Sequence, residues 1–376
     1  MFSLHVDTSR SWRGRQRQAL LTVLGLRAHG HRAALVAHPD GELRRRASEG
    51  TDLYPFAPRT TMDLSAAWKL SRLMRELQPD VVHAHDRQAM AMTALALSLG
   101  SSALRTRFVA SAPVDSHLQR NAFSRWQNQQ VECFVCLSDF VKSMLIDDGV
   151  PAERSAVVRE GVDLAHVNAA PPIDLHKEYW LPHNAPLVGS IGDLVPHAGQ
   201  RYLIDAAAIV VRSVPDARFL LVGDGELDEM LRHQIKHLHL EKHVLLAGFR
   251  PDELSLLKGV DLYVTSAVAG GSMGGVLDAM ACSRPVVATD TGGLPEVVQQ
   301  GETGLVVPTR DAASFADAIV TLLEHPDRRT EYGRQGLERV RRHFSVDRLV
   351  DETTALYRNV ADRPRVTGNP GPPSAD

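Results

Sequence analysis

Short apolar runs rich in Val, Ile, Leu and Ala alternate with longer amphipathic stretches along almost all of the 376 residues. This alternation is typical of parallel sheets with helices packed on both faces, so it predicts the α/β class. The strands predicted in the first half are 4–6, 33–37, 81–84, 108–110, 133–137 and 156–158. A second series follows at 187–191, 219–222, 244–247, 262–265, 286–288 and 305–307.

The two series of strands are separated by residues 166–186, which lose all periodicity. The prolines in this segment are predicted to exclude regular structure; they are Pro171, Pro172, Pro182 and Pro186. We therefore predict two similar-sized domains. In chain order the predicted parts are a first domain over 1–168, a linker over 169–186, a second domain over 187–345, a helix over 346–361 and a disordered tail over 362–376.

Helix signals support this division. Residues 16–29 place apolar side chains largely on one face and stop at Gly30, a residue suited to a helix C-terminus. Ser138 is the expected N-cap of a helix that ends at Gly149. The last predicted helices are 312–323, 328–343 and 346–360.

Composition and charge narrow the functional classes. The chain has 42 Lys and Arg against 45 Asp and Glu, a net charge of −3, which argues against a dedicated nucleic-acid binder. The longest apolar stretch, 89–99, is too short to cross a bilayer. The Arg-rich run 7–17 stands where a signal peptide would need an apolar region. We therefore expect a cytoplasmic protein.

The three cysteines do not provide a disulfide framework. Cys133 and Cys136 form a C-x-x-C within a predicted strand, and no second pair accompanies it. We interpret them as structural strand residues and expect no metal site.

Basic side chains gather in the first domain. Residues 1–165 carry 21 basic and 17 acidic side chains, whereas residues 166–376 carry 21 and 28. One cluster consists of Arg10, Arg13, Arg15 and Arg17, and a second spans residues 44–46. A solvated helix face accounts for such clusters. The alternative is a docking surface for an anionic acceptor or an anionic lipid surface, through which the chain would contact a membrane peripherally.

The segment 269–275 (AGGSMGG) is the leading candidate for a ligand site. It connects a predicted strand to a predicted helix, and its four glycines leave backbone N–H groups open. Ligands of open parallel sheets bind beyond the carboxyl ends of the strands, and a helix N-terminus there suits a phosphate. The glycine turns at 223–225 and 291–293 are weaker signals of the same kind, and a plain turn explains each alone.

Taken together, several segments resemble glycosyltransferase family 4. In the second half they are 221–225 (LVGDG), 277–288 (LDAMACSRPVVA), 292–298 (GGLPEVV) and 301–308 (GETGLVVP). In the first half they are 79–85 (PDVVHAH), Ser138 with the helix after it, and 161–163 (GVD). The resemblance extends from Leu4 to Arg358 and implies the GT-B fold: two facing Rossmann-like domains, a nucleotide-sugar bound mainly by the second, an acceptor bound by the first, and a last helix crossing back.

The resemblance also implies donor-binding positions, with retaining chemistry that needs no metal or cofactor. The matching residues are Gly14, Gly192, Arg201, Phe249, Arg250, Gly271, Gly274, Gly275, Val276 and Asp278. Asp278 matches the second acid of the family's acidic pair, which holds the ribose hydroxyls. Arg201 is a substitute cation one helical turn beyond the family's lysine position.

Four positions depart from the family pattern. Asp193 and Ala198 stand where the family has an arginine and a lysine for the diphosphate. Gly270 replaces the acid that contacts the donor sugar, and Pro113 replaces a strand-end histidine. The substitutes for the lost catalytic groups are Asp115, His117 and His197, although each also suits a surface polar role; for His83 and His85 we expect buried structural roles.

The sequence therefore predicts a glycosyltransferase-like protein that transfers a sugar from a nucleotide-sugar to a glycan, lipid or small-molecule acceptor, with an atypical active site. The departures favour an alternative, a non-catalytic subunit that binds a nucleotide, a glycan or an active partner glycosyltransferase. A nucleotide-sugar epimerase of the same fold is disfavoured, because it too would need the diphosphate cations.

Overall fold

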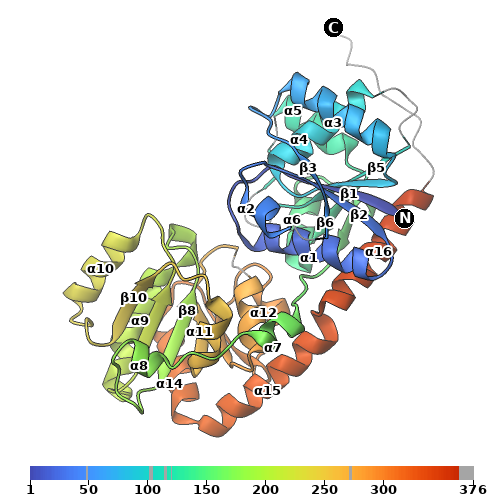
Figure 1. Ribbon diagram of the computed structural model, residues 1–376. Coiled ribbons are helices and arrows are strands. Elements are labelled where there is room, and N and C mark those ends of the chain that lie inside the picture. Colours follow the sequence, from blue (N-terminus) through green and yellow to red (C-terminus); the bar gives the residue numbers. More distant parts are fainter. Residues whose placement is uncertain (48–49, 101–104, 114–116, 120, 271–272, 364–376) are drawn as a thin grey trace.

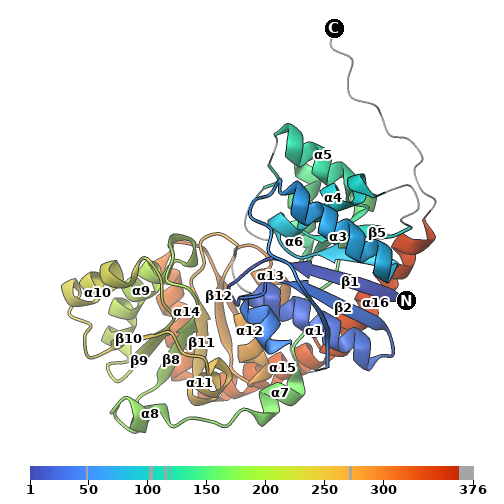
Figure 2. The ribbon, with the colours of Figure 1, turned by 45° about the horizontal axis from the view of Figure 1, so that its top comes forward.

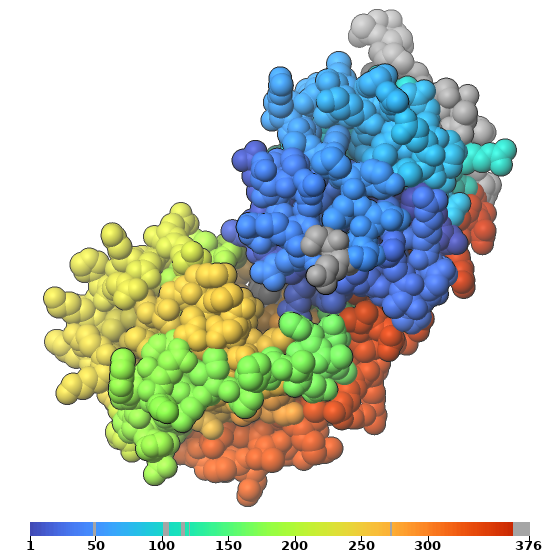
Figure 3. Space-filling view, in the orientation of Figure 1, coloured from blue at the N-terminus to red at the C-terminus, as the bar shows by residue number. Residues whose placement is uncertain are grey.

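The computed structural model describes residues 1–47, 50–100, 105–113, 117–119, 121–270 and 273–363. The predictions for Asp115, Gly271 and residues 364–376 lie outside these residues. Two parallel sheets form two lobes, joined by the segment that carries α7 and by the long helices at the end of the chain (Figure 1). The space-filling view shows the same two lobes (Figure 3).

The first sheet has seven strands in the order β3-β2-β1-β4-β5-β6-β7. Their bounds are β1 Phe2–Asp7, β2 Arg32–Ala37, β3 Asp52–Pro55, β4 Val81–Ala84, β5 Arg107–Ser111, β6 Cys133–Cys136 and β7 Ser155–Val157. The helices between them are α1 Gly14–Ala28, α2 Glu42–Arg46, α3 Leu64–Leu77, α4 Arg87–Leu99, α5 Ala122–Gln130, α6 Asp139–Asp147 and the short 3₁₀ turn Ala152–Arg154. Central strands are buried on both faces, as in other parallel sheets.

The second sheet has six strands in the order β10-β9-β8-β11-β12-β13. They are β8 Leu187–Ile191, β9 Arg218–Val222, β10 Val244–Gly248, β11 Leu262–Thr265, β12 Val286–Thr289 and β13 Gly304–Val307. The helices are α9 Gln200–Ser213, α10 Asp228–His237, α11 Glu253–Gly259, α12 Met273–Ala281, α13 Leu294–Val297 and α14 Ala312–Glu324, with a 3₁₀ turn at Pro196–Ala198. All strand pairs of both sheets are parallel, so the predicted α/β class is confirmed.

Two details differ from the predictions. The edge strand β3 (Asp52–Pro55) was not predicted; its residues are half-buried or exposed, so it lacks an apolar pattern. The Pro-rich segment was predicted to exclude regular structure, but α7 (Leu164–Ala169) and α8 (Leu175–Glu178) form there. Each begins after an aspartate, Asp163 or Asp174, whose carboxylate accepts a backbone N–H of the first turn. The division into domains remains a prediction in its exact boundaries.

The last helix returns to the first sheet. After α15 (Pro326–His343) packs against α12, α16 (Val346–Asp362) runs along α1 (Figure 1). A Cβ at Gly25 of α1 would overlap the side chain of Val350, so the two helices approach closely there. Figure 2 shows α1 next to α12, where the two lobes meet. In the part of the chain that the structure describes, no helix is both long and apolar enough to span a membrane.

Candidate functional site

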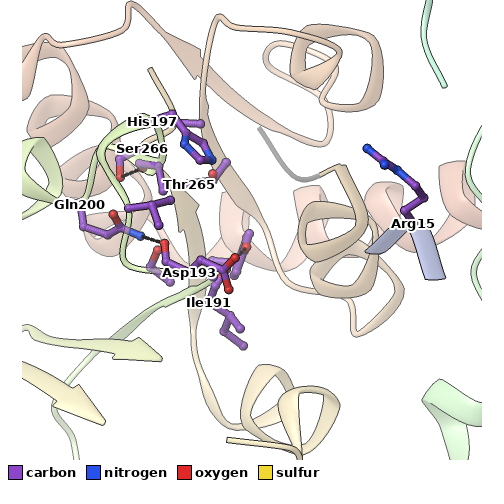
Figure 4. Close-up of a pocket in the computed structure, with 13 residues that line it drawn as sticks. Arg15, Ile191, Asp193, His197, Gln200, Thr265 and Ser266 are labelled. Carbon is purple, nitrogen blue, oxygen red and sulfur yellow. Dashed lines mark hydrogen bonds between the residues drawn. The ribbon is translucent and has the colours of Figure 1, made fainter. Parts of the chain in front are cut away.

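A cavity of about 230 Å³ lies at the carboxyl ends of β8 and β11, between the lobes; we call it cavity 1. It is lined by Arg15, Ser190, Ile191, Gly192, Asp193, Val195, His197, Ala198, Gln200, Tyr263, Thr265, Ser266 and Ala267 (Figure 4). All of these except Arg15 belong to the second lobe. The carboxyl ends of parallel strands are the expected place for a ligand in an open sheet.

The turn that follows β8 is held against the loop after β11. Ser266 Oγ donates to the carbonyl of Ala198 at 3.0 Å, and the N–H of Val268 donates to the carbonyl of His197 at 2.8 Å. Gly199, at φ +70°, begins α9, and a Cβ there would overlap the carbonyl of Ser266. Only glycine fits this position. The close approach of Gly199 to Ser266 brings the N-terminus of α9 to the cavity.

Gln200 is a buried polar residue in the wall of cavity 1. Its Nε2 donates to the carbonyl of Asp193 at 2.8 Å, whereas its Oε1 has no hydrogen-bond partner among the described residues. The side chain is 4% exposed. A buried acceptor without a partner is costly, so a ligand hydroxyl or a water that donates to Oε1 would be stabilised there.

Asp193, which the family resemblance predicts to replace an arginine, has its negative charge balanced from the other lobe. Arg13 Nη1 lies 3.1 Å from Asp193 Oδ2. Both side chains are substantially exposed, so the pair contributes little stability. It nevertheless removes most of the repulsion that an unpaired carboxylate would exert on a phosphate in cavity 1.

Asp278 also pairs with the first lobe. Arg17 donates from both Nη atoms to the carboxylate, with Nη2 2.6 Å from Oδ1. The Asp278 side chain is 3% exposed and lies in α12, behind the glycine-rich segment. The prediction that Asp278 holds ribose hydroxyls is not tested by this geometry, but a donor would have to share or replace Arg17.

Two further carboxyl groups lie close to this ion pair. Burial raises the pKa of Glu160 to about 7, against the opposing effect of Arg17, and Asp278 raises it further. Glu160 Oε2 has no hydrogen-bond partner in the part of the chain that the structure describes. Burial and the charge of Asp278 also raise the pKa of Glu253. The Arg17 guanidinium therefore pairs with the buried Asp278 and lies near a second buried acid, Glu160.

A second cavity, cavity 2, of about 160 Å³ lies in the first lobe at the ends of β4 and β5. It is lined by Arg15, His85, Asp86, Arg87, Met90, Ser111, Pro113, Leu118, Gln119, Ser124, Gln127 and Asn128. Pro113, which the family resemblance predicts to replace a histidine, is in its wall. Arg15 is the residue that lines both cavities.

Three buried histidines lie beside cavity 2 in one hydrogen-bonded chain. Its members, in order, are Ser3, His5, His85, Ser111, His83 and Tyr357 of α16, with successive distances of 3.0, 2.9, 3.2, 3.1 and 2.7 Å. Burial lowers the pKa of His5 to about 3 and those of His83 and His85 well below their usual value. The expected buried roles of His83 and His85 are confirmed, although His85 also reaches a cavity wall.

This trio is a group of described residues whose ligand atoms lie within 4.8 Å of one another, as a metal would require. Each of the six ring nitrogens already has a protein partner, however. A metal would have to replace those bonds, so the cluster is better explained as a neutral hydrogen-bond network. Cys133 and Cys136 are buried, free strand residues, as predicted.

Several predicted donor-binding residues do not reach cavity 1. Arg201 is exposed, with its guanidinium over the ring of Tyr202. Arg250 pairs with Asp252 and Glu178 and contacts Tyr179 Oη at 3.0 Å, while Phe249 is 65% exposed. Of the other predicted residues, four line cavity 1: Gly192, Asp193, His197 and Ala198. Gly14 is the first residue of α1. Gly270 precedes α12, and Gly274, Gly275 and Val276 lie in its first turn.

Gly275 has a packing reason to be glycine. A Cβ there would come within 2.7 Å of Tyr263 Oη, which itself donates to the carbonyl of Ile191 at 3.3 Å. His117, a predicted substitute base, is an exposed residue that pairs with Asp148 at 2.9 Å and does not line cavity 2.

The sequence reasoning missed the roles of Arg13, Arg15 and Arg17. They were interpreted as a solvated or docking surface of the first domain, yet Arg13 and Arg17 bind carboxylates of the second lobe and Arg15 faces both cavities. Their position directly after the first strand, at the carboxyl edge of a parallel sheet, was the available signal.

Comparisons with known proteins agree with this architecture. The model of "Glycosyltransferase Family 4" matches residues 12–166, and that of "Glycosyl transferases group 1" matches residues 185–325. The putative glycosyltransferase EpsD of Bacillus subtilis is 25% identical over 82% of this chain and 83% of its own. The phosphatidyl-myo-inositol mannosyltransferase of Mycobacterium tuberculosis is 28% identical over 75% of this chain and 74% of its own.

Solved structures show the same fold at low identity. Anabaena Alr3699/HepE, in a complex with UDP and glucose, has a TM-score of 0.82 and 23% identity, with 96% of this chain and 100% of that chain covered. The sucrose-phosphate synthase tll1590 of Thermosynechococcus elongatus has a TM-score of 0.75 and 18% identity, over 96% and 98%. The two parallel α/β sheets are therefore arranged as in these proteins.

Proposed function

Because the chain belongs to glycosyltransferase family 4 and has the GT-B fold, we propose that it transfers a sugar from a nucleotide-sugar to an acceptor. The acceptor class is a glycan, a lipid or a small molecule. The names of the similar proteins support this range, since they include a mannosyltransferase that acts on phosphatidyl-myo-inositol and a structure with bound UDP and glucose.

The observation that carries the proposal is the pair of cavities that share Arg15 across the two lobes. Cavity 1 would take the donor, because it lies at the strand ends of the second sheet and beside the N-terminus of α9. Cavity 2 would take the acceptor. A sugar held near Arg15 would then lie between its leaving group and the attacking hydroxyl.

Transfer without a metal and with retention of configuration is part of the same proposal, and it rests on the family resemblance. In such chemistry the departing diphosphate is stabilised by protein cations and by backbone N–H groups at helix N-termini. The acceptor hydroxyl attacks the anomeric carbon, the bond to the diphosphate breaks, and the hydroxyl proton leaves with the diphosphate.

The test is calorimetric titration of the purified full chain with UDP, GDP, ADP and their sugar conjugates, each with and without magnesium. We expect one nucleotide series to bind with micromolar affinity irrespective of magnesium. If none of the nucleotides or nucleotide-sugars binds, the donor proposal is refuted.

A second candidate function is a non-catalytic subunit that binds a nucleotide, a glycan or an active partner glycosyltransferase. The specific observation in its favour is that Asp278 and Asp193 are both engaged by arginines of the first lobe, which a donor would have to displace or share. Nucleotide binding without any transfer to a panel of acceptors, combined with stimulation of a partner enzyme, would favour this function.

Peripheral membrane contact is also proposed, through the exposed apolar side chains Met62, Leu64 and Trp68 at the start of α3. The exposed basic residue Lys69 on the same helix complements an anionic lipid surface. Sedimentation with vesicles of phosphatidylglycerol and phosphatidylcholine is the measurement. Trp68→Ser should reduce binding, whereas Trp180→Ser, at an exposed site in the linker, should not.

A further inference from the structure

Asp193 and Ala198 provide no positive charge for a diphosphate in cavity 1, but the first lobe does. Among the described residues that line cavity 1, Arg15 is the one with a permanently positive side chain. It enters from α1, on the far side of the cavity from Gln200 and His197 (Figure 4). The lost cations of the second lobe are thus matched by a cation presented from the opposite lobe.

Arg15 forms no ion pair with the described residues, in contrast to its neighbours Arg13 and Arg17. Arg13 is bound to Asp193 and Arg17 to Asp278, which fixes the start of α1 against the second lobe. Within the described part of the chain, the Arg15 guanidinium has neither a hydrogen bond nor an ion pair. Asp193, the carboxylate in the wall of cavity 1, is already paired with Arg13, and Asp7 is the buried carboxyl group with which Arg15 interacts electrostatically. With no hydrogen bond or ion pair of its own among the described residues, the Arg15 guanidinium is available to a ligand in cavity 1.

Neutral groups of cavity 1 complete a site for a phosphorylated sugar. The first turn of α9 has no side-chain cap; the N–H of Tyr202 donates to the carbonyl of Gly199 at 2.9 Å, and the remaining N–H groups of that turn suit an anion. Gln200 Oε1 is buried without a partner and requires a donor such as a sugar hydroxyl. The cavity therefore offers a guanidinium and N–H groups for phosphate, and an acceptor for a hydroxyl.

We propose that Arg15 binds the diphosphate of the nucleotide-sugar and replaces the two cations that the family places at positions 193 and 198. This inference rests on the proposed function and names the residue that makes it possible. Since Arg15 also lines cavity 2, it lies where the leaving group meets the acceptor. It binds the oxygens of the diphosphate more strongly as their charge increases during departure of the sugar.

The test compares affinities for a nucleoside monophosphate and the matching diphosphate, measured by calorimetry on the full chain with UMP and UDP, GMP and GDP, and AMP and ADP. Wild-type protein should bind one diphosphate about tenfold or more tightly than its monophosphate, as expected for charge-assisted hydrogen bonds. In Arg15→Ala that preference should fall to about threefold or less, and Arg15→Lys should restore part of it. Arg59→Ala removes an exposed arginine of the same lobe that lines neither cavity and should preserve the preference.

The outcomes separate this inference from the proposed function. If wild-type protein binds none of the nucleotides, both are overturned. If it binds a diphosphate and Arg15→Ala keeps the preference, the role of Arg15 is overturned while the proposed function stands. An equal loss in Arg59→Ala would show a general effect of net charge and would also overturn the role of Arg15. Unchanged melting temperatures of the variants verify that folding is intact.

Discussion

Arg17 of α1 and Asp278 of α12 form a two-pronged ion pair across the boundary between the lobes, although 261 residues separate them in the chain. The carboxylate is buried and the guanidinium is about a quarter exposed. This contact joins the lobes at the acid that the family resemblance assigns to the ribose. If Asp278 binds the donor, as the resemblance implies, the contact between the lobes and donor binding depend on the same carboxylate.

The first prediction concerns the stability contributed by this pair. Asp278→Asn should lower the free energy of unfolding by roughly 2–3 kcal/mol, because Arg17 is left without its charged partner. Arg17→Met combined with Asp278→Asn should cost less than the sum of the single changes, since the double variant leaves no unpaired charge. Urea denaturation measures the three values, and the exposed Arg232–Asp228 pair serves as a control with little effect. Strict additivity at the Arg17 and Asp278 positions would contradict the prediction.

The second prediction concerns the role of Asp278 in the reaction. If its carboxylate accepts the ribose hydroxyls, Asp278→Ala should abolish measurable transfer and weaken nucleotide binding by about tenfold to a hundredfold. Binding of the free nucleotide separates this effect from loss of the chemical step. Retained transfer in a folded Asp278→Ala protein would remove Asp278 from the donor site.

Most of the fold could be predicted because local signals and global packing agree. Twelve of the strands were predicted from apolar runs that the structure buries, such as those around Phe108 and Phe219. The edge strand β3 has no such run: its four residues are half-buried or exposed, and it ends at Pro55. The helices α7 and α8 were not predicted, although each has an aspartate N-cap, because the neighbouring prolines were interpreted as excluding helices from the whole segment.

The candidate site could be predicted only in part, because its decisive contacts join distant segments. The strand-end position of Gly192 and Asp193 follows from the sequence pattern and is found in the cavity wall. The pairing of Arg13 with Asp193 depends on how the two lobes face each other, which no local pattern encodes. Arg201 was expected from helical spacing to face the donor, but the rotation of α9 directs it to solvent.

The third prediction tests whether cavity 1 keeps the geometry of an ordinary donor site. Asp193→Arg combined with Ala198→Lys restores the family cations and also frees Arg13, so the affinity for a nucleoside diphosphate should rise by about tenfold or more. The gain should shrink as salt is added, because it is electrostatic. Calorimetry at two salt concentrations measures both effects. An unchanged affinity would mean that the geometry around positions 193 and 198 has diverged.

The fourth prediction concerns the histidine network. Tyr357→Phe removes the hydroxyl that pairs with buried His83 and should lower the free energy of unfolding by about 1–3 kcal/mol. Tyr202→Phe, a change at a ring that is stacked under Arg201, should cost much less. Chemical denaturation of both variants gives the comparison. Equal effects would show that the bond between Tyr357 and His83 contributes no stability.

The fifth prediction is a pH dependence set by Glu160. Burial raises its pKa from 4.5 to about 7, with a smaller contribution from Asp278, so the folded protein binds this proton more tightly than the unfolded chain. The stability contributed by the protonated form is therefore complete below pH 4.5, falls as the pH rises toward 7 and is absent above it. Glu160→Gln, which stays neutral, should be more stable than wild type by roughly 2–3 kcal/mol at pH 8 and nearly equal to it at pH 4.5.

The buried histidines complicate a simple pH profile, because they act in the opposite direction. Their folded-state pKa values are lowered by burial, so they reduce stability as the pH falls below about 6.5. This effect is common to wild type and Glu160→Gln, and it cancels in the difference between their unfolding free energies. Urea denaturation at pH 4.5, 6 and 8 therefore isolates Glu160. A difference that stays constant over this range would show that Glu160 does not titrate between its unfolded value and pH 7.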